Sequence, residues 1–88
     1  MSIAEFSEHL GRPFVVEPIG KAWRCYFQGV MYTDKPGLNA VAISIIGAGP
    51  NRQRMREDFV GKIHGKVART YDGTGHHREF PVPIALRT

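Results

Sequence analysis

Three arginines near the middle of the chain have the types and spacing best suited to bind an anion. Arg52, Arg54 and Arg56 follow the glycine turn at residues 47–50 and open an expected helix. A helix N-terminus offers free N–H groups and partial positive charge, and glycines let an anion approach the backbone. Arg52 and Arg56, one turn apart, can grip neighbouring phosphates. This pattern predicts salt-sensitive, sequence-independent contact with a polyanion.

Further basic residues and one tyrosine extend this prediction. Tyr26 lies on an expected strand beside Arg24, where an exposed ring can stack on an unpaired base. Trp23 and Phe27 alternate with it on the other face, where we expect them to pack in the core. The predicted nucleic-acid-binding set consists of Arg52, Arg54, Arg56, Lys62, Lys66, Arg24 and Tyr26.

The glycine turn lacks the complete signature of a nucleotide-binding loop. A dinucleotide fingerprint requires G-x-G-x-x-G, but Arg52 occupies the third glycine position, and the G-K-[ST] element of a P-loop is missing. The alternative is a tight turn followed by a solvated helix end. Three arginines oppose the helix dipole in the first turns, however, so local propensity does not account for them.

Other chemistries find little support in the sequence. A closed zinc site needs about four ligands, usually including thiolates, and the chain offers one cysteine and an adjacent His76-His77 pair. Cys25 falls on the apolar face of an expected strand, where a buried, inert thiol is typical. No serine lies in a G-x-S-x-G elbow. We therefore expect no metal, no cofactor and no enzymatic activity.

Length and composition predict a single domain over residues 1–88. One cysteine excludes an internal disulfide and favours a reducing, cytoplasmic setting. The N-terminus lacks the pattern of a signal peptide, and the longest apolar run, residues 41–46, is too short to cross a bilayer. Residues 1–44 carry four basic and four acidic side chains, whereas residues 45–88 carry eight basic and four acidic ones. The entire net charge of +4 therefore lies in the second half, which favours an anionic partner or a solvated basic surface.

The apolar pattern predicts the elements that position these residues. A capping box at Ser2 and Glu5 opens a helix over residues 2–10. Strands are expected at residues 14–16, 21–28 and 30–32, with Gly29 as a bulge or turn. Residues 38–46 are rich in β-branched side chains and small on their second face, so we expect a central strand covered on both sides.

The second half continues with a helix and a hairpin. The helix begins near Pro50 or Asn51 and buries Met55, Phe59 and Ile63, which repeat every fourth residue. Residues 67–71 and 77–83 form a hairpin around the loop at residues 72–75, with Pro81 and Pro83 marking an edge strand. The tail, residues 84–88, has no assigned structure.

These elements define an α+β fold, a small antiparallel sheet with two helices in the order α-β-β-β-α-β-β. Residues 21–71, with the Gly47-Ala48-Gly49 turn between strand and helix, resemble the HicB-type antitoxin fold. Their architecture is also similar to that of the double-stranded RNA-binding domain. The chain departs from the first in its basic helix start and from the second in its added C-terminal hairpin.

The sequence thus favours a small non-enzymatic module that contacts RNA or DNA through its basic helix start. The alternative is a protein-interaction module, such as an antitoxin-like or phage-type inhibitor of a nucleic-acid-handling complex, with an acidic protein surface as its partner. Strand pairing at residues 77–83 would serve such a partner, and a homodimer through an edge strand is a further expectation.

Overall fold

Helix α1 (Ile3–Leu10) opens the chain in the computed structural model, which describes residues 1–88. Ser2 Oγ accepts a hydrogen bond from the Glu5 N–H at 3.1 Å, and Glu5 Oε1 accepts one from the Ser2 N–H at 2.9 Å. Gly11 ends the helix in the left-handed conformation at φ 68°. The buried face consists of Ile3, Phe6 and Leu10. The predicted capping box and buried face are therefore confirmed.

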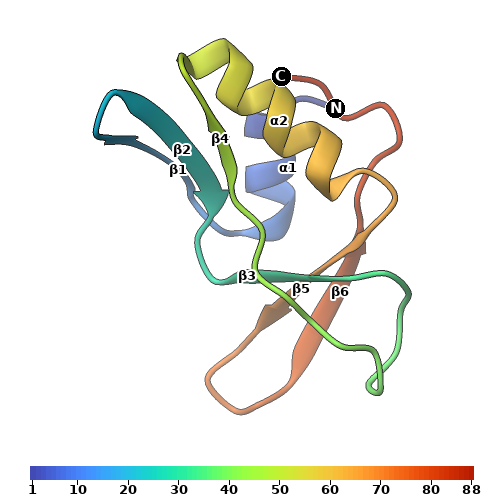
Figure 1. Ribbon diagram of the computed structural model, residues 1–88. Coiled ribbons are helices and arrows are strands. Elements are labelled where there is room, and N and C mark those ends of the chain that lie inside the picture. Colours follow the sequence, from blue (N-terminus) through green and yellow to red (C-terminus); the bar gives the residue numbers. More distant parts are fainter.

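Two three-stranded antiparallel sheets make up the rest of the framework (Figure 1). The first sheet has the order β1-β2-β4 and consists of β1 (Phe14–Ile19), β2 (Ala22–Phe27) and β4 (Gly47–Gly49). The second has the order β3-β5-β6 and consists of β3 (Val30–Thr33), β5 (Val67–Tyr71) and β6 (His77–Pro81). The α+β class and the order of elements are confirmed, but the expected single sheet is divided in two.

A bend at Gly29 causes this division. Gly29 takes a positive φ of 73°, which glycine adopts without strain. Before the bend, β2 pairs with β1 and β4; after it, β3 pairs with β5. The predicted bulge or turn therefore carries the chain from one sheet into the other. Strand β6 lies at the outer edge of the second sheet, as its proline predicted.

The predicted central strand at residues 38–46 is wrong. Only Ile43 forms a bridge there, with Tyr32 of β3, and Leu38 and Val41 are exposed. The next pairing, Gly47 with Cys25, leaves residues 44–46 opposite the longer stretch 26–31. A continuous ladder needs equal lengths on both sides, so the bend opens the pairing here. The β-branched composition indicated strand propensity but could not supply a matching neighbour.

Helix α2 (Arg52–Ile63) packs unusually close to β4. A Cβ atom added to Gly47 would lie 2.8 Å from the Met55 carbonyl oxygen and 2.9 Å from Phe59 Cα. One added to Gly49 would lie 2.7 Å from the Met55 backbone nitrogen. The glycines are therefore required for contact between the strand and the helix backbone, and the expected strand-ending turn is itself a short strand.

Both helices meet the first sheet on one face. The Phe27 ring of β2 lies 5.7 Å from Phe6 of α1 and 5.5 Å from Phe59 of α2. The same core extends to the second sheet through Tyr32, Ala68 and other buried residues. One core therefore unites both sheets and both helices, although the backbone ladders are separate.

A carboxylate fastens β4 to α2 and gives a testable pH dependence. Asp58 Oδ2 accepts a hydrogen bond from the Ala48 N–H at 2.9 Å and lies 2.9 Å from Lys62 Nζ. The Ala48 N–H and, secondarily, Lys62 lower the pKa of Asp58. A depressed folded-state pKa adds stability above the unfolded value, near 4, and that stability is lost as pH falls through the folded value.

Replacing Asp58 with asparagine is therefore expected to lower the free energy of unfolding at pH 7 by about 1 kcal/mol, because the site is partly exposed. Urea unfolding should show the difference shrinking below about pH 4. The adjacent Glu57→Gln variant is the control, since the Glu57 carboxylate accepts a hydrogen bond only from the Gln53 side chain on the same helix. An Asp58→Asn difference that persists unchanged at pH 2 would contradict this account.

Candidate nucleic-acid interface

The first turns of α2 carry the arginines at the centre of the candidate interface. The helix is capped by Asn51, whose Oδ1 accepts a hydrogen bond from the Arg54 N–H at 2.9 Å. Met55, Phe59 and Ile63 are buried, as predicted. Arg52 and Arg56 are one turn apart and therefore extend from the same flank of the helix.

That flank lies over aromatic rings of the first sheet. The Arg52 guanidinium carbon lies 4.5 Å from the ring centroid of Trp23 on β2, within the range of a cation–π contact. Arg56 lies over the ring of Phe14 on β1 at 5.9 Å, near the limit of that range. Neither guanidinium has a carboxylate within ion-pair distance. Both keep N–H donors available for an anion.

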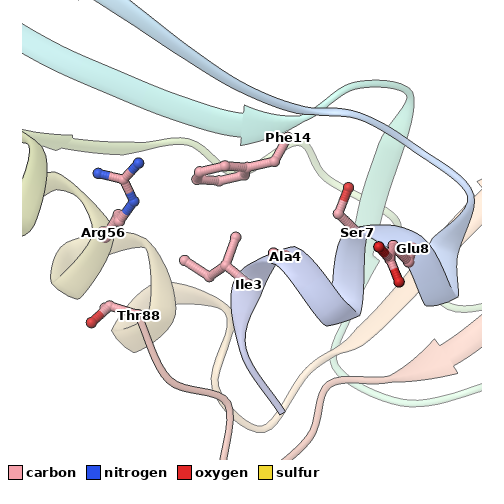
Figure 2. Close-up of a pocket in the computed structure, with 7 residues that line it drawn as sticks. All are labelled: Ile3, Ala4, Ser7, Glu8, Phe14, Arg56 and Thr88. Atoms are coloured by element: carbon pink, nitrogen blue, oxygen red, sulfur yellow. The ribbon is translucent and has the colours of Figure 1, made fainter.

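An open pocket of about 510 Å³ adjoins Arg56 (Figure 2). Its apolar lining includes Ile3 of α1 and the Phe14 ring, and the Arg56 guanidinium lies beside them. Its remaining polar side chains are those of Ser7, Glu8 and Thr88. The pocket thus combines apolar surface with the Arg56 guanidinium at one end and the Glu8 carboxylate at the other (Figure 2). A planar ring fits there with its negative group toward Arg56 and away from Glu8.

Arg54 does not join this pair. Residues two positions apart on a helix lie about 200° apart around its axis, so Arg54 leaves α2 on the opposite flank. Its Cβ lies on the β4 side, 3.1 Å from the place where a Gly49 Cβ would be. Of the three predicted arginines, Arg52 and Arg56 therefore lie together, and Arg54 lies apart from them.

Three other predicted cations differ from the Arg52–Arg56 pair because each forms an ion pair with a carboxylate. Lys62 Nζ lies 2.9 Å from Asp58, and Lys66 Nζ lies 2.7 Å from Asp34. Arg24 Nε donates to Glu17 Oε1 at 2.9 Å across the β1–β2 ladder. Their charge is partly neutralised within the protein, which weakens their contribution to anion binding.

Tyr26 also lies apart from the arginine pair. It lines a second pocket together with Met31, Ile45, Ile46 and Tyr71. Alternation along β2 places it on the sheet face opposite Trp23. The aromatic residues beside the arginines are instead Trp23, half-buried, and Phe14. Alternation grouped Trp23 correctly with the helix-covered face, but nothing in the sequence showed that Arg52 would cover its ring.

The glycine turn contributes packing instead of an anion cradle. Gly47 and Gly49 face the α2 backbone, so the space that glycine leaves open is filled by the helix. The Ala48 N–H donates to Asp58 and the Arg54 N–H to Asn51. Anion binding at this end of the molecule therefore depends on arginine side chains.

The remaining reactive group is the single thiol. Cys25 is fully buried and its Sγ donates to the Met55 carbonyl oxygen at 3.9 Å. Burial raises the pKa of this thiol to about 11, which leaves it protonated at neutral pH. Its predicted place on the apolar face of the strand is confirmed.

No helix in the chain is both long and apolar enough to span a membrane.

No protein-family model matches the chain, and comparison with curated proteins and with solved structures finds no similar protein. The resemblances to the HicB-type fold and the double-stranded RNA-binding domain therefore remain predictions.

Proposed function

We propose that this protein is a non-enzymatic module that binds single-stranded RNA or DNA through the arginine–aromatic surface, defined by Arg52, Arg56, Trp23 and Phe14. The observation that carries the proposal is the pairing of two uncompensated guanidinium groups with two aromatic rings. A cytoplasmic setting, in keeping with the single unpaired cysteine, is part of the same proposal.

Single-stranded nucleic acid fits this chemistry better than a duplex does. Successive phosphates can accept hydrogen bonds from Arg52 and Arg56, while an unpaired base stacks on a guanidinium plane or an aromatic ring. Such stacking contributes about 1–3 kcal/mol per base and tolerates any sequence. The pocket beside Phe14 provides room for a planar base. The net charge of +4 attracts the polyanion from a distance.

The only tryptophan of the chain provides the test, because it lies within the proposed site. Titration with single-stranded oligo-dT or oligo-U at low salt should change the fluorescence of Trp23. Each phosphate contact should contribute about −0.7 to the slope of log K against log salt, so two contacts give about −1.4. An unchanged spectrum together with no change in the anisotropy of a labelled oligonucleotide would overturn the proposal.

The second candidate is a protein-interaction module, such as an antitoxin-like or phage-type inhibitor of a nucleic-acid-handling complex. The exposed apolar side chains of residues 38–46 favour it, because such patches mark interaction surfaces. Pull-down from the source cell distinguishes the two candidates. A defined protein partner that persists after nuclease treatment favours the second, and co-purifying nucleic acid favours the first.

A further inference from the structure

Residues 38–46, here called the apolar segment, expose the most hydrophobic stretch of the chain. Leu38 and Val41 are each 81% exposed, Ile43 is 51% exposed and Ile46 is 45% exposed. Isolated apolar residues are common on protein surfaces, but four exposed ones in a single short segment indicate an interaction surface.

The apolar segment also has an open backbone edge. Ile43 exchanges both hydrogen bonds with Tyr32 of β3, at 2.7 and 2.9 Å. The N–H and C=O groups of Ala42 and Ser44 form no hydrogen bond within the protein. Neighbouring residues of an antiparallel bridge direct these groups away from the paired strand, so the groups of Ala42 and Ser44 face outward. An edge of this kind can accept another strand.

A groove lies on the other side of the apolar segment, toward the bent strand. Where the bent strand and the apolar segment lose pairing, a pocket of about 330 Å³ opens between them, lined mainly by hydrophobic side chains. Tyr26 and Met31 line it from one side, and Ile45 and Ile46 from the other. The groove lies on the bent-strand side of the segment, so it leaves the outward edge at Ala42 and Ser44 open.

The charge of this part of the chain indicates which partner could pair with the exposed edge. Residues 36–51 contain no Asp, Glu, Lys or Arg and form the longest uncharged stretch of the chain. Two copies of a protein with net charge +4 repel one another, but this stretch carries no charge of its own. The charged side chains beside Val41 and Ile43 are Asp34 and Lys66, which pair with each other at 2.7 Å. A neutral, apolar strand is also self-complementary, as a twofold interface requires.

We infer that the apolar segment joins two copies of this chain in a twofold dimer by antiparallel strand pairing centred on Ile43. Ala42 of each copy then exchanges backbone hydrogen bonds with Ser44 of its partner copy, and Val41 lies opposite Ile45. The dimer extends the ladder that Ile43 and Tyr32 begin. It leaves the arginine–aromatic surface free, because Trp23 and Phe14 lie on the helix-covered face of the first sheet.

Sedimentation velocity of the full chain between about 1 and 200 μM tests the dimer. The expected mass rises from 9.9 kDa to twice that value with concentration. Val41→Lys places charge inside the interface and should weaken dimerisation at least ~10-fold. Ser44→Pro removes an outward N–H and should also weaken it. Ile84→Lys is the matched control, since Ile84 is 86% exposed in the C-terminal tail, and it should dimerise like the wild type.

Circular dichroism and Trp23 fluorescence establish that each variant is folded. A mass that stays at 9.9 kDa throughout the range overturns the inference, and so does undiminished dimerisation of folded Val41→Lys. If the mass stays at that of the monomer, the partner of the apolar segment must be a different protein. Oligonucleotide binding is measured separately, so failure of the dimer leaves the proposed function standing.

Discussion

Replacing Gly47 with alanine is expected to lower the free energy of unfolding by about 3 kcal/mol or more, the upper range for overpacking a core. The added methyl group would collide with Phe59 Cβ and lie 2.8 Å from the Met55 carbonyl oxygen. Two of the nearest atoms belong to the α2 backbone, so no side-chain rotation relieves the clash. The helix would have to move off β4 as a unit.

Gly61→Ala is the matched control, because it adds the same methyl group within α2 where no other atom lies within 4 Å. Alanine has the higher helix propensity, so this variant should gain about 1 kcal/mol. Urea unfolding monitored by circular dichroism measures both changes. Equal stability of the Gly47→Ala variant and the wild type would show that β4 and α2 are not in backbone contact.

Removing both Arg52 and Arg56 is expected to weaken binding of single-stranded oligonucleotides roughly 10- to 100-fold at low salt, because two charge-assisted phosphate contacts are lost. The salt slope should fall by about 1.4 at the same time. The change should be measured by anisotropy of a labelled oligonucleotide, because loss of Arg52 also alters the surroundings of Trp23.

Arg54→Ala is the matched control for this experiment. It removes one arginine from the same helix but from the flank that faces β4, so its effect should be confined to the general loss of one charge. If Arg54→Ala reduced affinity and salt slope as much as Arg52→Ala, the polyanion would respond to net charge alone. The arginine–aromatic surface would then have no special part in binding.

Local sequence signals predicted the parts of the fold that depend on neighbouring residues. The Ser2 capping box, the Met55-Phe59-Ile63 stripe and the bend at Gly29 are each specified within a few positions. The strand expected over the apolar segment does not form, because strand formation depends on a partner elsewhere in the chain. Its partner is the bent strand, whose length between Cys25 and Tyr32 does not match the segment.

The candidate site shows the same limit. The sequence predicted that Arg52 and Arg56 lie on one flank of the helix, because their spacing is a local property. It could not show that Lys66 would meet Asp34, which lies in a distant loop, or that Trp23 and Phe14 would lie beneath the arginines. Long-range ion pairs and stacking contacts depend on the fold. In the structure, ion pairs remove several predicted cations from the candidate site, and stacking contacts add two aromatic rings to it.

The exposed edge of the apolar segment has a consequence for the behaviour of the protein in concentrated solution. Residues 41–46, VAISII, combine high β propensity with no charge and no proline, which is the composition of segments that stack into fibrils. Natural proteins protect such edges with charged residues, prolines or a covering element. Here the nearest charges in sequence are Lys35 and Arg52, so the segment has no such protection of its own. We therefore expect the protein to be less soluble when this edge stays exposed than when another strand covers it.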